Sequence, residues 1–112
     1  MLATILILLC AAIHGYFVWL EMFQWQARRT RKIFGTTAEF AAASKGLAAN
    51  QGLYNGFLAT GLLFGLWQGN TAMLGFLLAC IIVAGVYGAL TATKVAFFVQ
   101  SLPAALALWA LL

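Results

Sequence analysis

Residues 50–90 read NQGLYNGFLATGLLFGLWQGNTAMLGFLLACIIVAGVYGAL and contain no Asp, Glu, Lys, Arg or His. A helix of a soluble bundle keeps a charged face toward water, and this stretch has no ionisable residue with which to build one. A turn signal, Gly69-Asn70-Thr71, divides the stretch. The stretch therefore predicts two apolar helices, residues 47–68 and 72–90, that form a tight hairpin around a three-residue turn.

Two further apolar stretches, residues 2–25 and 96–112, flank this hairpin. A hydrocarbon core of about 30 Å needs about 20 apolar residues in a helix, so the last stretch, about 26 Å long, barely spans it. The chain is 65% hydrophobic and 7% charged, far from ordinary soluble composition. We expect an all-α fold: an antiparallel bundle of four transmembrane helices with an extended second helix, forming a single integral membrane domain over residues 1–112.

The basic residues predict the orientation of this bundle. Five lie in the first connection and one in the third: Arg28, Arg29, Arg31, Lys32 and Lys45, then Lys94. Because cytoplasmic loops are enriched in Lys and Arg, both connections are expected in the cytosol, with the N- and C-termini outside an inner (cytoplasmic) membrane. The net charge of +4 is then explained by the orientation of the chain in the membrane. The expected partner is the lipid bilayer, and no nucleic acid is expected.

The first connection carries a helix start signal. Thr36-Thr37-Ala38-Glu39 fits a capping box, so the second helix is expected to begin near Thr37 and either to run through Gly46 or to bend there. The alternative for this connection is a short interfacial helix, in which the basic cluster meets anionic headgroups at about 1 kcal/mol per residue.

Polar side chains of the predicted helices gather at one depth, the cytosolic half. With Trp25 as the interface anchor, Glu21 lies about 6 Å and His14 about 16 Å inside. Ionisable groups at such depths face the bundle interior or a wet cavity. We therefore predict a polar ligand-binding pocket formed by His14, Glu21, Gln24, Asn50, Gln51, Tyr54, Asn55, Tyr87 and Gln100. The alternative is that these groups only hydrogen-bond one helix to the next.

The cysteines and the single histidine bear on metal and disulfide chemistry, and the small residues and the proline bear on helix packing. Cys10 and Cys80 lie in separate apolar runs and His14 is the single histidine, so neither a disulfide, a metal site nor a cofactor is expected. Stripes of small residues on the second and third helices, such as Gly52-Gly56-Thr60 and Ala84-Gly88, predict close helix packing. Self-association into a homo-oligomer is a second use for these faces. Pro103 predicts a bend in the fourth helix.

The chain resembles a family of small membrane proteins known as domain of unknown function 1304. The resemblance rests on His14 with Leu20–Trp25, the run Asn50-Gln51-Gly52-Leu53-Tyr54-Asn55-Gly56, Ala84–Gly88 and Gln100–Ala104. It covers nearly the whole chain, and it implies a fold and a membrane location but no activity. Looser likenesses are to the trimeric membrane proteins of eicosanoid and glutathione metabolism, whose acidic residue and arginines are absent here, and to small multidrug transporters.

Three functions follow as hypotheses. The first is a membrane protein that binds or transports a small amphipathic or cationic molecule, with Glu21 as the charge or proton site and His14 as its relay. The second is an enzyme acting on a lipid-like substrate with Tyr54 or His14 as acid–base group, although no complete catalytic set can be assigned. The third is a structural or accessory subunit.

Overall fold

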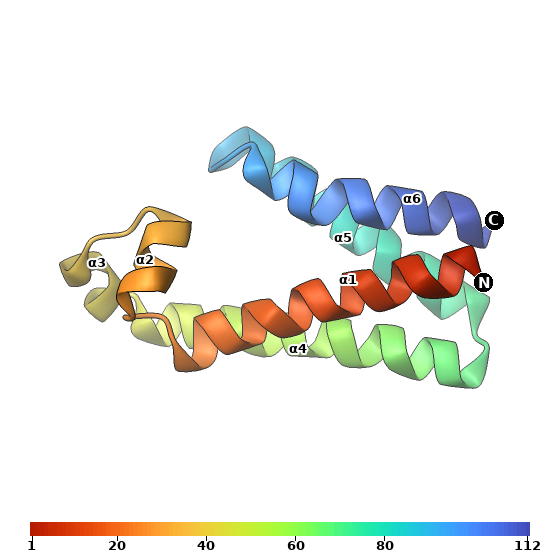
Figure 1. The fold of residues 1–112 in the computed structure, drawn as a ribbon, viewed down its shortest axis with the longest axis horizontal. Helices are drawn as coiled ribbons and strands as arrows, with labels where there is room; N and C mark the ends of the chain where they lie inside the picture. Colours follow the sequence, from red (N-terminus) through yellow and green to blue (C-terminus); the bar gives the residue numbers. More distant parts are fainter. The chain divides into compact units, whose positions relative to one another are not determined.

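The computed structural model describes residues 1–112 as helices and short connections without a strand, which confirms the all-α prediction. The elements are α1 (Leu2–Val18), the π-helix η1 (Trp19–Phe23), α2 (Arg28–Phe34), α3 (Ala38–Ala43), α4 (Lys45–Gln68), α5 (Thr71–Thr91), the π-helix η2 (Phe97–Ser101) and α6 (Leu102–Leu111) (Figure 1).

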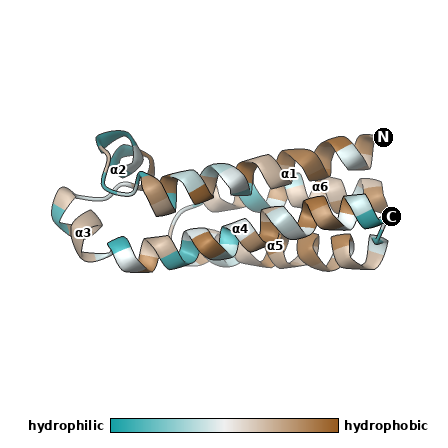
Figure 2. Ribbon diagram, turned by 90° about the horizontal axis from the view of Figure 1, so that it is seen from below, coloured by the Kyte–Doolittle hydropathy of each residue, from teal (hydrophilic) through white to brown (hydrophobic).

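Two helices are long and apolar enough to cross a membrane: the continuous run Leu2–Phe23, formed by α1 and η1, and α5. Figure 2 shows α1 largely in hydrophobic colours, whereas α2 is largely hydrophilic. The 24-residue α4 carries the amide side chains and is less apolar, and the run Phe97–Leu111 is shorter than a span. The coarse prediction of apolar helices is thus confirmed for two of them, and the bundle of four spans stays a prediction.

The chain divides into two compact units, and α1 and α4 contribute to both. Unit 1 consists of residues 1–13 with 58–112, and unit 2 of residues 14–57. Each unit has its own packing. The prediction of a single domain is left as a prediction.

Unit 1 has an apolar core to which four helices contribute small and branched side chains. The buried members are Ile7, Cys10 and Ala11 of α1, Leu62 of α4, Leu74, Leu78 and Ile81 of α5, and Ala104 and Ala107 of α6. The predicted hairpin of the second and third helices is confirmed. Gly69 turns the chain with a φ of 63°, and the Asn70 side chain accepts a hydrogen bond from the Met73 amide at 3.0 Å to cap α5.

The π-helical segment η2 packs closely against α5 in unit 1. Ser101 in η2 donates a hydrogen bond from its Oγ to the carbonyl oxygen of Ile82 at 2.7 Å. Gly85 of α5 lies directly against Ser101, so a Cβ there would be 2.7 Å from the Ser101 backbone nitrogen. Pro103 lies two positions after Ser101 and has no N–H for an α-type bond to the Val99 carbonyl. Where the sequence predicted a bend, the structure thus places a π-helical turn before the proline.

Unit 2 contains the connection between the first two long helices, where the structure confirms the helix start near Thr37 but corrects the capping residue and the position of the break. Thr37 is the N-cap of α3 and accepts from the Phe40 amide at 3.1 Å, one residue later than the box from Thr36 to Glu39 requires. The second helix is interrupted at Ser44, not at Gly46. The Ser44 hydroxyl donates to the Phe40 carbonyl at 2.7 Å and accepts from the Trp25 indole at 3.0 Å. The Phe40 carbonyl thus accepts from both the amide and the hydroxyl of Ser44, and such back-bonding by serine bends helices, which accounts for a break at serine instead of glycine.

Replacing Gly85 by alanine tests the close approach of α5 to η2. The added methyl group would collide with backbone and side-chain atoms of Ser101, so Gly85→Ala should lower the free energy of unfolding by about 1–3 kcal/mol. Gly75→Ala is the matched control on α5, because its Cβ would meet only Leu108, at 3.9 Å. Thermal unfolding in detergent measures both variants, and equal midpoints would contradict the described packing.

Candidate functional site

Glu21 is the buried carboxylate of unit 2, and the π-helical segment η1 positions it. Its side chain is 8% exposed, and Asn55 of α4 donates a hydrogen bond from Nδ2 to the Glu21 Oε1 at 2.6 Å. Asn55 is itself only 6% exposed. A carboxylate removed from water is costly unless polar groups compensate it, and Asn55 supplies that compensation.

Two glycines of α4 let its backbone lie close to the helix that carries Glu21. A Cβ at Gly52 would be 2.6 Å from Cγ of Met22 and 3.1 Å from Cβ of Glu21, and one at Gly56 would be 3.5 Å from Val18. Helix pairs that approach this closely use small residues at the contact. The glycine stripe predicted for the second helix therefore holds Asn55 at hydrogen-bond distance from Glu21.

His14 is fully buried in unit 2 and packs edge-on against Phe17, with ring centroids 5.6 Å apart and an interplanar angle of 84°. Glu21 lies seven positions further along the chain, which corresponds to about 10 Å along a helix. His14 therefore shares the buried side of this helix with Glu21 but lies two turns away. Its predicted role as a relay would need a group between the two side chains.

Gln24 follows η1 and lies beside a small polar hollow of about 140 Å³ at the end of that segment. The hollow is lined by Met22, Phe23, Gln24, Trp25, Gln26, Ala27 and Lys45. Lys45 is the charged member of this set and begins α4. The structure thus brings Gln24 to the same end of unit 2 as Glu21, beside a cation.

Asn50, Gln51 and Tyr54 are exposed on α4 and do not join Asn55 at the helix contact. The packed stripe of α4 runs through Ala48, Gly52 and Asn55, all buried, and the other three side chains lie on neighbouring stripes. Tyr54 has a ring contact with Phe57 on its own helix at 5.8 Å. These three side chains are thus accessible to a ligand but lie away from the contact that buries Glu21. Their part in ligand binding stays a prediction.

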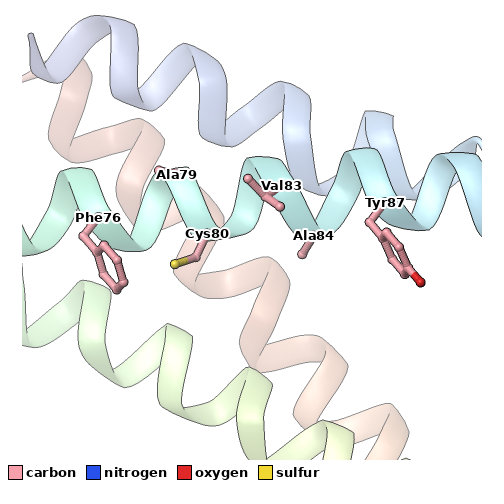
Figure 3. Close-up of a pocket in the computed structure, with 6 residues that line it drawn as sticks. All are labelled: Phe76, Ala79, Cys80, Val83, Ala84 and Tyr87. Carbon is pink, nitrogen blue, oxygen red and sulfur yellow. The ribbon is translucent and has the colours of Figure 1, made fainter.

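Tyr87 and Gln100 belong to unit 1. Tyr87 is exposed on α5, and Gln100 is half-buried in η2. Tyr87 lines an open hollow of about 590 Å³ whose lining comes from α5 alone: Phe76, Ala79, Cys80, Val83, Ala84 and Tyr87 (Figure 3). This surface is apolar apart from the tyrosine hydroxyl and the thiol, so it suits contact with hydrocarbon.

Sequence reasoning missed the polar contacts that Trp25, Ser44 and Ser101 make. The sequence predicts Trp25 as an interface anchor, yet its indole donates a hydrogen bond to Ser44 within unit 2. Ser101 bonds the Ile82 carbonyl within unit 1. One usable signal was present for Asn55: it is the polar residue in line with the small residues Ala48 and Gly52.

The side chains that could bind a metal ion do not form a cluster. The structure has no group of three or more His, Cys, Asp or Glu side chains that could hold a metal ion. Cys10 is a buried cysteine and Cys80 a half-buried one, and no disulfide joins them. The candidate site is therefore the Glu21–Asn55 pair, and its chemistry is that of a carboxylate oriented by an amide.

The chain is similar to a protein family and to a curated protein. A family model described as "Protein of unknown function (DUF1304)" matches residues 8–112. The "Uncharacterized protein YpaA" of Lactococcus lactis subsp. lactis (strain IL1403) is 33% identical over 111 residues, which cover 96% of this chain and 93% of that protein. No solved structure matches the chain.

Removing the Asn55 side chain tests the pair. Asn55→Ala should leave the Glu21 carboxylate buried without its amide donor, which costs about 1–3 kcal/mol of unfolding free energy. Asn50→Ala is the control, because Asn50 is exposed on the same helix and its loss should change stability by less than about 0.5 kcal/mol. Unfolding midpoints in detergent give both numbers. A difference of zero between the variants would show that the hydrogen bond contributes nothing.

Proposed function

The chain belongs to the DUF1304 family, and with that premise we propose that it is an integral membrane protein that binds a small cationic amphipathic molecule at the Glu21–Asn55 pair. Glu21 supplies the negative charge and Asn55 orients its carboxylate. Transport of that molecule across the bilayer is the extension of this proposal. The observation that carries it is the 2.6 Å hydrogen bond between two buried side chains of η1 and α4.

The membrane location has support in the exposure of the two apolar runs. In the most apolar window of Leu2–Phe23 and of α5, 22% of the residues are buried. A core helix of a soluble protein would be mostly buried, whereas here large side chains such as Leu8, Leu9 and Val83 are exposed. Apolar surface of this extent calls for lipid or another apolar partner.

The proposed topology has four spans, with α4 and the run Phe97–Leu111 as the third and fourth. The two basic connections lie in the cytosol and both termini lie outside, because Lys and Arg are enriched in cytoplasmic loops. In this arrangement Glu21 lies near the cytosolic end of the first span. A ligand therefore reaches the carboxylate from the cytosol or the inner leaflet.

The residue types favour a binding site over a structural tie between helices. A pair of amides would join the same two helices without the cost of taking a carboxylate out of water. Ionisable residues inside membrane segments mark ligand or ion paths for this reason. A carboxylate accepts several hydrogen bonds, and Asn55 provides one, so Glu21 retains capacity for a cationic group.

Neutralising Glu21 tests the proposed function, and Glu39 offers a matched control. These are the two acidic residues of the chain, and Glu39 is exposed on α3. Binding of tetraphenylphosphonium, a permanent lipophilic cation, is measured by isothermal titration calorimetry in detergent. Glu21→Gln keeps the shape and the bond to Asn55, and it should weaken binding at least tenfold, or about 1.4 kcal/mol.

The Glu39→Gln variant should bind the probe as the unchanged protein does. Equal affinity in the Glu21 and Glu39 variants, or no binding by the unchanged protein, would contradict the proposed cation site. A lower unfolding midpoint in Glu21→Gln with unchanged affinity would favour the accessory-subunit hypothesis instead.

A further inference from the structure

We propose that the segment from α2 to α3, residues 28–43, is a basic cap that binds the headgroups of anionic phospholipids at the bilayer surface. This inference concerns a surface separate from Glu21. It depends on the proposed membrane span Leu2–Phe23 but not on the proposed cation site.

The charges of the cap lie on the outer side of α2. Four of the six Lys and Arg residues of the chain fall between Arg28 and Lys32. Thr30 is fully buried, which defines the inner face of this helix. Arg28 and Lys32, four residues apart, therefore share the opposite face, and Arg29 is exposed beside them. Glu39 is the one acidic residue in the cap, so the surface is strongly cationic.

Apolar side chains stand exposed next to these cations. Ile33 is 52% exposed and Phe40 is 57% exposed. Phe34, Gly35, Thr36, Thr37 and Phe40 line an open hollow of about 400 Å³ between the two short helices. A surface that combines cations with apolar side chains is typical of segments that lie in the interface of a membrane with anionic lipids.

Specific contacts hold the cap in one conformation. Gly35 ends α2 in the left-handed region with a φ of 70°, and its N–H donates to the Arg31 carbonyl. The Trp25 ring packs against Phe34 with centroids 5.0 Å apart while its indole N–H bonds Ser44. The cap is therefore ordered before any ligand binds, and little conformational entropy is lost on binding.

Chain position identifies the bilayer as the occupant of this surface. The span Leu2–Phe23 ends shortly before α2 begins at Arg28, so the cap lies where headgroups are. Basic clusters immediately cytoplasmic of a membrane helix gain about 1 kcal/mol per Lys or Arg from anionic lipid. Ile33 has no aromatic ring on which a nucleic-acid base could stack, whereas a lipid interface accommodates both Ile33 and Phe40.

Spin labels on the full chain test this proposal. Cys10 and Cys80 are replaced by alanine, and a nitroxide is attached at Ile33→Cys or, in a second variant, at Phe40→Cys. The protein is placed in nanodiscs of phosphatidylcholine, with or without a third of the lipid replaced by phosphatidylglycerol. We expect phosphatidylglycerol to lower several-fold the collision of either label with a water-soluble nickel complex and to raise its collision with oxygen.

Charge variants separate electrostatic binding from simple proximity. Arg28→Gln/Arg29→Gln/Lys32→Gln should lose the effect of phosphatidylglycerol, whereas Arg28→Lys/Arg29→Lys, which keeps every charge, should retain it. Equal nickel accessibility of both labels in the two lipids would overturn the proposal, as would protection that survives in the glutamine variant. Because these readouts do not involve Glu21, a failure of cation binding leaves them unaffected.

Discussion

The close contact between α4 and the π-helical segment η1 is the constraint on which the candidate site depends. Gly52 and Gly56 have no side chains, so nothing at these positions holds the two helices apart. Only at that separation can the short side chain of Asn55 reach the Glu21 carboxylate. A buried carboxylate is costly when its hydrogen-bond partner is lost. The glycines and Asn55 are therefore needed together to keep Glu21 buried.

A comparable arrangement occurs in unit 1. There the π-helical segment η2 brings Ser101 against Gly85, and the hydroxyl reaches the Ile82 carbonyl. Each π-helical segment thus places one polar side chain at a contact with a glycine-lined helix. Single π turns inside α-helices are rare and are frequent at functional sites. In this chain one of them carries a carboxylate and the other a hydroxyl.

Much of the fold follows from the sequence, because the apolar runs and the hairpin at Gly69-Asn70 have strong local signals. The start of α3 near Thr37 does as well, although the capping residue is one position later than expected. The break at Ser44 could not be predicted, because it depends on Trp25, a residue distant in the chain. For the site, the sequence selected Glu21 and Asn55 among nine residues. It could not separate Asn55 from Asn50, because that needs the packed stripe of α4.

Each π turn has a consequence for how the chain tolerates changes in its length. A π turn holds one residue more than an α turn, and each residue advances a helix by about 100°. Deletion of one residue between Val18 and Gln24 would convert this turn into an ordinary α turn, so the residues after it would keep roughly their direction and Trp25 would still face Ser44. The same deletion within α1 would instead rotate every following residue by about 100°. The extra residue of the π turn is therefore a position at which the chain tolerates a change in length.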